Sequence, residues 1–164
     1  ELVYDGYGPG GAAILLEVYT ENKNRTVADV RHAFSKNGGN LAENGSVAWQ
    51  FKHCGEILVP DKGQDEDEFT LAALDAGAED VSKDEDGYLV YTAVEDLHST
   101  NENLSKAGFV SSEASLTYLP TNKTEVSTDD LPKLLRLLEA LDDLDDVQET
   151  YVNVDIPEDA YAEA

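Results

Sequence analysis

The succession of apolar and polar positions predicts alternating strands and helices, and therefore an α+β fold. Residues 12–19 form a continuous apolar run interrupted only by Glu17, which is typical of a strand covered on both faces. The opening residues Leu2–Tyr4 are strand-like as well. A helix is predicted to begin at Asn24 and to end at Gly38-Gly39, because glycine readily closes a helix in the left-handed conformation. Its core-facing stripe, at i, i+3 and i+7, consists of Val27, Val30 and Phe34.

The middle of the chain predicts the order β-α-β-β-α-β, which is that of a ferredoxin-like domain. The acidic run Asp65–Glu68 opens its first helix, and Asp86-Gly87 predicts a turn before its third strand. Thr92 and Glu95 fit a capping box for its second helix. The four strands are expected at 57–60, at Val81, at 88–92 and at 115–119, and the two helices are expected to end at Gly77 and Gly108.

The last part of the chain carries the strongest amphipathic pattern. Ser127–Asp130 offers N-cap candidates and Pro132 is allowed in a first helical turn. Strands are predicted on either side of this helix, at Thr124–Val126 and Tyr151–Ile156, and another at Ser46–Phe51. The apolar stripe of the helix consists of Leu131, Leu134, Leu135, Leu138 and Leu141.

These elements predict two lobes, with a ferredoxin-like (βαββαβ) domain inserted into a second α+β domain. The inserted domain is expected at residues 54–119. The outer domain is then discontinuous, built from 1–53 plus 120–156, and we expect it to form a second, interrupted β-α-β-β-α-β. Residues 157–164 are expected to be a tail.

Charge is distributed very unevenly between the two parts of the chain. The formal net charge is −24, from 11 Lys and Arg against 35 Asp and Glu. Residues 1–53 carry five Lys and Arg against six Asp and Glu, a net −1, whereas the remaining 111 residues carry six against 29, a net −23. A field of that sign repels nucleic acid. The first third is therefore the only segment suited to an anionic partner.

Other features narrow the class of protein. A single cysteine, Cys54, excludes an internal disulfide and suits a reducing compartment. No apolar run approaches the roughly 20 residues that cross a bilayer, and no signal-like pattern is present. We expect a cytoplasmic protein, or a mitochondrial one if the source is eukaryotic, that is a monomer and has no membrane partner. The chain lacks methionine and opens directly on a strand-like segment, so we expect a truncated chain without its true N-terminus.

Two features of the first third could form a contact surface. Arg25, Asp29, His32 and Lys36 follow one another on the solvent face of the first helix, with Arg31 at its flank. The residues alone favour a solvated face with an Arg25–Asp29 pair worth about 0.3 kcal/mol. The second feature is a glycine-rich loop that precedes a strand, so it is neither a P-loop nor a dinucleotide fingerprint. A structural turn explains it as well as a contact loop does; its residues are Tyr7, Gly8, Pro9, Gly10 and Gly11.

Catalytic and metal-binding patterns are missing from the sequence. Asp84–Asp86 resembles the start of an EF-hand loop, but Ser82 and Ala93 stand where ligands are needed. His32, His53 and His98 fall on separate elements, so they predict no zinc site. No Ser/His/Asp or Cys/His set stands out. We therefore expect no enzyme, no metal and no cofactor.

Several long motifs resemble the YebC-type family. They are Tyr7–Gly11 (YGPGG), residues 24–36 (NRTVADVRHAFSK), residues 38–41 (GGNL), residues 45–48 (GSVA) and the ending at residues 141–148 (LDDLDDVQ). The resemblance covers essentially the whole chain. It departs from the expected pattern at Trp49-Gln50, a change that affects packing more than function.

The resemblance implies a fold of three parts: a basic N-terminal helical domain, an α+β domain, and a ferredoxin-like domain inserted in it. This sequence resembles only the second and third. Members are known as probable transcriptional regulators and as ribosome-associated translation factors, which act by binding DNA or by relieving ribosome stalling. The implied partners are DNA or ribosomal RNA and the ribosome, with help from the absent domain.

With the resemblance included, we expect contact residues on the first helix and the segment that follows it, and in the loop at 7–11. The contact residues are Arg25, Arg31, His32, Lys36 and Asn40. Loss of both Arg25 and Arg31 is then expected to weaken RNA or ribosome association. The alternative function is an acidic protein-interaction module that docks basic partners without touching nucleic acid.

Overall fold

The computed structural model describes residues 2–156, which divide into two compact units. Unit 1 combines the described residues up to Lys52 with those from Leu119 onward, and unit 2 is His53–Tyr118. The fold is α+β, with a ferredoxin-like unit inserted into a second α+β unit, as the sequence predicts. The tail predicted for 157–164 lies outside the described residues.

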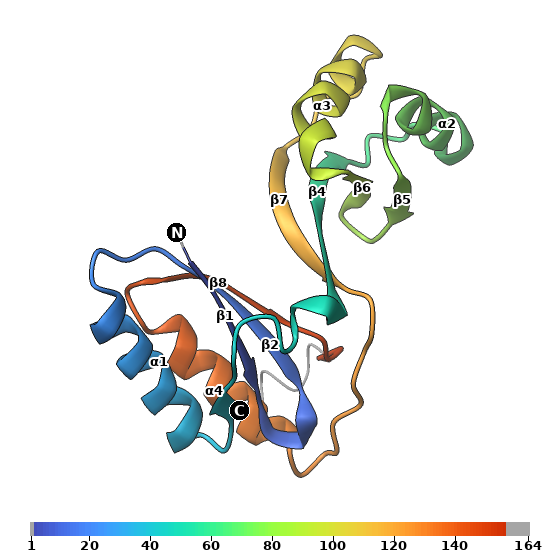
Figure 1. The fold of residues 1–164 in the computed structure, drawn as a ribbon. Helices are drawn as coiled ribbons and strands as arrows, with labels where there is room; N and C mark the ends of the chain where they lie inside the picture. The colour runs from blue at the N-terminus through green and yellow to red at the C-terminus, as the bar shows by residue number, and fades with distance from the viewer. Residues whose placement is uncertain (1, 157–164) are drawn as a thin grey trace. The chain divides into compact units, whose positions relative to one another are not determined.

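Unit 1 is a four-stranded antiparallel sheet with two helices on one face (Figure 1). The order across the sheet is β3-β1-β2-β8. A short 3₁₀ turn, Pro9–Gly11, joins β1 to β2 as a hairpin. The strands are β1 (Leu2–Tyr7), β2 (Ala13–Val18), β3 (Asn40–Leu41) and β8 (Val147–Val152), and the helices are α1 (Lys23–Lys36) and α4 (Leu131–Asp142).

The core of unit 1 lies between β2 and the two helices. All side chains of β2 except Glu17 are buried, which confirms a strand covered on both faces. The predicted stripe of α1 faces this core through Val30 and Phe34, while Val27 is half-buried. A Cβ at Gly6 would collide with the Phe34 ring, so glycine lets α1 approach the sheet closely. From α4 the core receives Leu134, Leu137 and Leu141.

The opposite face of the sheet is covered by the loop that follows β3. The carboxylate of Asp5, which is buried, accepts hydrogen bonds from the backbone N–H groups of Val47 and Ala48, each at 2.9 Å. These two groups open the 3₁₀ turn Ala48–Gln50. Because the N–H groups of a helical start lack internal partners, a carboxylate at this place satisfies them.

Unit 2 is a second four-stranded sheet, with α2 and α3 packed on one face (Figure 1). The strand order β5-β6-β4-β7 is the ferredoxin-like arrangement of the chain order βαββαβ. Its core contains a cluster of three rings in which Phe69 touches both Tyr88 and Phe109. The strands are β4 (Phe51–Pro60), β5 (Asp80–Lys83), β6 (Gly87–Thr92) and β7 (Glu113–Pro120), and the helices are α2 (Glu66–Ala76) and α3 (Leu97–Lys106).

Three predictions about unit 1 are wrong. Ser46–Phe51 is no strand, because Asp5 draws Val47 and Ala48 into the 3₁₀ turn; the short β3 takes the place at the sheet edge. Thr124–Val126 is also no strand. The described residues of unit 1 therefore follow the order ββαβ before the insertion and αβ after it, and not a second β-α-β-β-α-β.

Two local predictions need correction as well. The capping box of Thr92 and Glu95 does not form, because the Thr92 side chain is buried in β6 and donates to the carbonyl of Ala93. A 3₁₀ turn, Val94–Asp96, leads into α3 in its place. The last strand begins at Val147 and not at Tyr151.

A buried amide, that of Asn153, holds the point where unit 2 is inserted into unit 1. Its Oδ1 accepts from the N–H of Ala13 at 2.8 Å, and its Nδ2 lies 2.9 Å from Gln50 Oε1 and 2.8 Å from the carbonyl of Asn122. Gln50 stands just before β4 and Asn122 just after β7, and the Gln50 carbonyl also accepts from the N–H of Thr121. One side chain therefore joins the outgoing and returning segments to the beginning of β2.

We predict that Asn153→Ala lowers the free energy of unfolding by about 1–3 kcal/mol, because it leaves buried polar groups without partners. Urea unfolding followed by circular dichroism measures the change. Asn44→Ala serves as the control, since Asn44 is exposed. Equal unfolding midpoints for the two variants would show that the Asn153 amide is dispensable.

Candidate nucleic-acid interface

Helix α1 presents the predicted cations on its solvent face. Asn22 caps its start by accepting from the N–H of Arg25 at 3.1 Å. Its end lies at Asn37 and Gly38, where Gly38 adopts φ = 82° and allows the chain to turn back toward the sheet. Arg31, His32 and Lys36 are all exposed, as the helical spacing predicts.

Arg25 has a partner other than the one expected. Its Nη2 lies 3.2 Å from the Asp146 carboxylate, in the turn before β8, and Asp29 is not that partner. The same carboxylate accepts from Thr26 Oγ1 at 2.7 Å. These contacts, led by the Thr26 hydrogen bond, lower the pKa of Asp146 from its ordinary value. Arg25 thus helps to fasten α1 to β8, and a phosphate would have to compete with Asp146 for it.

The loop at 7–11 is built mainly by packing and internal hydrogen bonds. The N–H of Gly8 donates to the Ala12 carbonyl at 2.8 Å, and the N–H of Gly11 donates to the Gly8 carbonyl at 3.1 Å. Pro9 has no N–H and is buried. A cradle for phosphate needs several backbone N–H groups pointing outward. Two of those in this loop are already used.

Several predicted contact residues nevertheless meet at one end of unit 1. Asn40 pairs with Tyr7 across β3 and β1. Pro9 Cγ lies 3.5 Å from the position that a Cβ on Gly38 would occupy. The hairpin turn, the end of α1 and β3 are therefore adjacent. Arg25 lies 11 residues before Lys36, about 16 Å along the helix, so it is not part of this group.

Two cations that the sequence reasoning left out lie at the same end. Lys133 and Arg136 stand on α4 and line a surface recess of about 370 Å³ together with Lys36, Asn37 and Gly38. The sequence interpretation treated α4 as a core helix because of its leucine stripe. The i, i+3 spacing of Lys133 and Arg136 was a signal that both share one face. That this face borders the end of α1 follows only from the tertiary packing.

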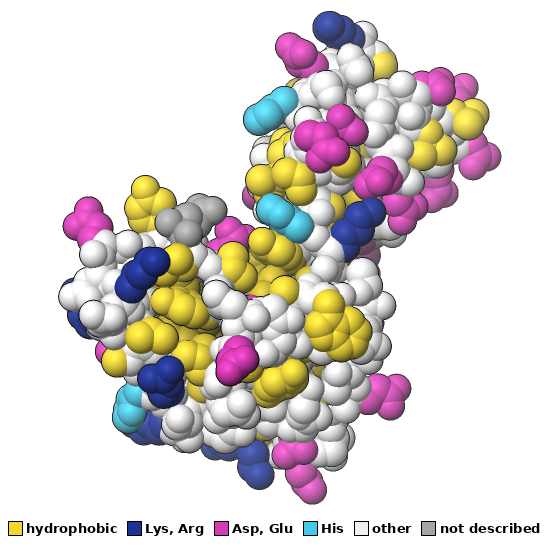
Figure 2. All heavy atoms as spheres, viewed as in Figure 1, with side chains coloured by type: hydrophobic (Ala, Val, Ile, Leu, Met, Phe, Trp, Pro, Cys, Tyr) yellow, Lys and Arg dark blue, Asp and Glu magenta, His cyan; other side chains and the backbone are white. Residues whose placement is uncertain are grey.

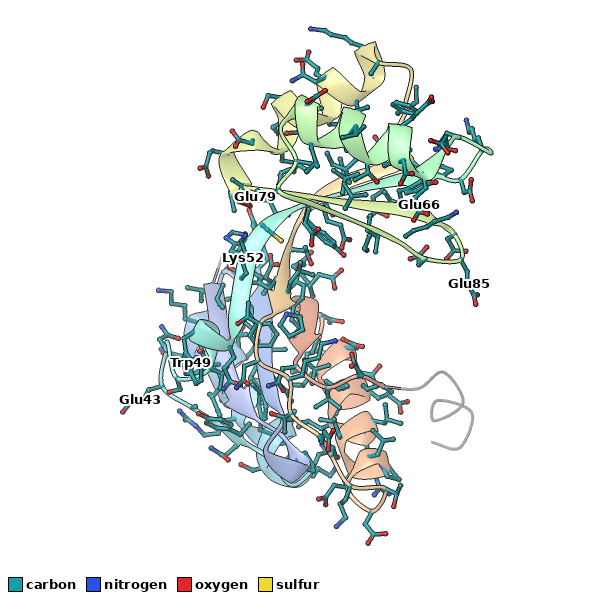
Figure 3. All side chains as sticks on the ribbon, turned by 90° about the vertical axis from the view of Figure 1, so that its right-hand side faces the viewer. Glu43, Trp49, Lys52, Glu66, Glu79 and Glu85 are labelled. Carbon is teal, nitrogen blue, oxygen red and sulfur yellow. The ribbon has the colours of Figure 1, made fainter. Side chains whose placement is uncertain are left out.

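Trp49 lies at the surface in the loop after β3, where Figure 3 labels it with Glu43. Its side chain is 68% exposed, and its Nε1 donates to the Ser46 carbonyl at 3.0 Å. The neighbouring Gln50, in contrast, is buried in the hydrogen-bond network of Asn153. The two residues where the sequence departs from the YebC-type pattern thus have different environments, one exposed and the other buried.

The remaining surface is mostly acidic. In the face shown in Figure 2, Asp and Glu dominate unit 2, whereas most Lys and Arg side chains lie on unit 1. Residues 53–118 carry 16 Asp and Glu against three Lys, a net −13. Glu66 and Glu85 are exposed, and Glu85 extends outward from the turn between β5 and β6 in Figure 3. Unit 1 also has an acid-edged groove of about 540 Å³ between α4 and β8, lined by Leu135, Leu138, Glu139, Asp142, Asp143, Thr150 and Val152.

One other pair of titratable groups is perturbed, on the face of the unit 2 sheet away from its helices. Glu56 and Tyr91 are opposite each other in β4 and β6 and share a side-chain hydrogen bond. Burial raises the pKa of Glu56, and burial with the nearby Glu56 charge raises the pKa of Tyr91 to about 12. Within residues 2–156, no group of three His, Cys, Asp or Glu side chains could hold a metal, and no helix is long and apolar enough to cross a membrane.

We predict that Asp146→Asn lowers the melting temperature at neutral pH. Folding lowers the pKa of Asp146, so its carboxylate stabilises the folded state at pH values above the unfolded pKa of about 3.9. This stabilisation is lost as the pH falls through the lower pKa of the folded state. The deficit of the variant should therefore shrink in acid. Thermal melts of Asp146→Asn and of the exposed neighbour variant Asp145→Asn, across the range from about pH 7 to pH 3, measure this. A melting temperature equal to that of the control at neutral pH would contradict the role of Asp146.

Comparison with known proteins gives consistent results over nearly the whole chain. A protein named a probable transcriptional regulatory protein, from Acidithiobacillus ferrooxidans, is 51% identical over 162 residues, which cover 99% of this chain and 64% of that protein. A relative of the same description from Symbiobacterium thermophilum is 47% identical over 161 residues, covering 96% of this chain and 66% of its own length. The chain thus spans about two thirds of these relatives.

A solved structure and a family model agree with these relatives. The crystal structure of a conserved hypothetical protein from Aquifex aeolicus matches with a TM-score of 0.84 and 41% identity, over 96% of this chain and 65% of that one. The family model for the second and third domain of TACO1/YebC matches residues 1–154. The chain therefore belongs to the TACO1/YebC family, and it carries that family's second and third domains.

Proposed function

We propose that this chain belongs to a non-enzymatic regulator of gene expression that binds nucleic acid or the ribosome through unit 1. The observation that carries the proposal is the exposed cationic side of α1, in a chain whose net charge is −24. The names of the relatives, probable transcriptional regulatory proteins, support the regulatory role. Regulation of transcription on DNA and a translation role on the ribosome both fit such a surface.

The contact surface would centre on Arg31, His32 and Lys36, with Asn40 and the hairpin turn at 8–11 beside Lys36. Arginine suits a phosphate because its planar fork can donate to two oxygens at once. Arg25 contributes less than the sequence suggests, because Asp146 already neutralises it. The acidic remainder of the chain would repel the backbone elsewhere and so restrict binding to this side.

The structure supports binding over catalysis as the mode of action. Clearly shifted pKa values belong to Glu56, Lys83, Tyr91 and Asp146. Burial raises the pKa of Glu56 against the opposing effect of its hydrogen bond with Tyr91. Burial and the nearby Glu56 raise the pKa of Tyr91, and contacts with Thr26 and Arg25 lower the pKa of Asp146. Asp146 borders a surface recess of about 260 Å³, where its contacts with Thr26 and Arg25 join α1 to the turn before β8. Perturbed titratable groups that mark an active site would instead converge on one cleft, and Glu56 and Tyr91 lie in the other unit.

A second candidate function rests on the acidic surface. Unit 2 has a net charge of −13, and the groove between α4 and β8 combines Leu135 and Leu138 with Glu139 and Asp142. Such a surface suits a basic, partly apolar protein segment. In this alternative the protein docks basic partners and does not touch nucleic acid directly.

We predict that Arg31→Ala combined with Lys36→Ala in the whole protein weakens binding to RNA, duplex DNA or ribosomes. Each phosphate contact removed should reduce the slope of log K against log salt by about one, so the double variant should lose about two. Fluorescence anisotropy with labelled RNA and DNA, and co-sedimentation with ribosomes, over about 50–200 mM salt measure this.

The matched control removes two cations of unit 2, in Lys62→Ala with Lys106→Ala, and should bind as the wild type does. If the α1 variant and the control bind equally, the α1 surface is not the contact. If the wild type binds a basic protein and none of the nucleic-acid or ribosome samples, the acidic docking function is the correct one.

A further inference from the structure

We infer that the recess between the end of α1 and the beginning of α4 is a phosphate-binding subsite for a nucleic-acid backbone. It is lined by Lys36, Asn37, Gly38, Lys133 and Arg136 and measures about 370 Å³. We call it the α1–α4 recess. The inference rests on the proposed function and adds to it the chemical group recognised and two residues of α4.

The charges around the α1–α4 recess are the first argument. Three of the 11 Lys and Arg residues of a chain with net charge −24 line this one recess, and no acidic side chain does. Within the described part of the chain, Lys133 Nζ lies 4.0 Å from the Asp130 carboxylate, and the lysine side chain is 58% exposed. An exposed pair at that distance contributes little. Among residues 2–156, Asp130 is therefore a weak partner for one of the three cations, and an anion that entered the recess would meet an excess of positive charge.

The positions of these cations on their helices are the second argument. Lys36 lies in the last turn of α1, where a positive charge is favoured by the helix dipole. Lys133, in contrast, is the third residue of α4, where the dipole disfavours a cation. The interaction with the helix dipole thus explains why a lysine stands at position 36, and it does not explain the lysine at position 133. An anion held between them would offset the unfavourable placement.

The chemistry of the lining favours phosphate over an acidic peptide. None of the five lining residues is a branched aliphatic or an aromatic one, and the apolar part of the lining comes largely from the stems of the lysine and arginine side chains. A peptide would therefore find no pocket for an aromatic or branched aliphatic anchor, the kind of residue that supplies most of the energy at protein interfaces. Arg136 offers a planar fork, the two lysines offer point charges, and the Asn37 side chain is held in place by donating to the Ala33 carbonyl at 2.8 Å. Phosphate oxygens suit that set of donors.

The neighbourhood of the recess supports a polymer over a single ion. Lys36 belongs both to the recess and to the exposed side of α1, where Arg31 and His32 precede it. On its other side Pro9 of the hairpin turn lies next to Gly38. A backbone that places one phosphate in the recess would therefore continue along α1 and meet the residues of the proposed contact surface.

The test is Lys133→Ala combined with Arg136→Ala in the whole protein, with Lys62→Ala combined with Lys106→Ala as the charge-matched control. Anisotropy titrations use single-stranded RNA and duplex DNA, each at several salt concentrations, with inorganic phosphate as a separate competitor at constant ionic strength. We expect the recess variant to bind on the order of tenfold more weakly, with the salt slope reduced by about two, and the control to be unchanged. Phosphate at millimolar concentration should compete only weakly.

A swap of the two cations, Lys133→Arg with Arg136→Lys, retains both positive charges and should retain the salt slope. It therefore shows whether the weaker binding of the alanine variant comes from lost charge or from a disturbed structure. If the recess variant equals the control while Arg31→Ala with Lys36→Ala weakens binding, the recess is no subsite and the proposed function stands. If the wild type binds no nucleic acid and no ribosome, both fail. Displacement of RNA by low phosphate concentrations would overturn the assignment to a polymer backbone.

Discussion

The hydrogen bonds of the buried Asn153 amide are the interaction on which the architecture depends. A chain that leaves one sheet to build another and then returns must bring two distant segments, around Gln50 and Asn122, to the same place. Their polar backbone groups are costly to bury without partners. Asn153 satisfies groups of both and joins them to Ala13 on β2, so the sheet of unit 1 is continuous despite an insertion of about 66 residues.

The packing of helices α1 and α4 on the sheet of unit 1 then determines where the cations of this unit lie. The sheet positions α1 and α4 side by side over one core, and Phe34 packs with Leu134 and Leu137 there. Because the helices begin and end at fixed points of that core, Lys36 comes to the same recess as Lys133 and Arg136. The proposed phosphate site is in this sense a product of core packing, since residues 36 and 133 are far apart in the sequence. Arg25, at the other end of α1, serves the fold through Asp146.

Most of the helices and strands could be predicted from the periodicity of apolar residues and from capping residues. The predictions that were wrong have physical causes. The helices at 23–36 and 131–142 have clear apolar stripes, and those at 66–76 and 97–106 end at glycines, so sequence pattern located all four. The start of the helix at 97–106 was less well predicted, because Thr92 is buried in β6 and forms no capping box. Ser46–Phe51 has the composition of a strand, but a carboxylate from Asp5, 42 residues away, decides its backbone. No local pattern reports such a contact, and the same holds for the Asn153 network and for the partner of Arg25. The α1–α4 recess was missed because it exists only where two helices meet.

Hydrogen exchange of the whole protein, with and without saturating RNA or ribosomes, followed by mass spectrometry, tests most directly whether the cationic end of unit 1 is the nucleic-acid contact. The account predicts slower exchange in three segments on binding, at 8–11, 31–41 and 131–137, because their backbones lie at or next to the proposed contact. Exchange in unit 2 should be unchanged, since its net charge of −13 disfavours a phosphate backbone. Protection confined to unit 2, with none at the end of α1 or the beginning of α4, would contradict it.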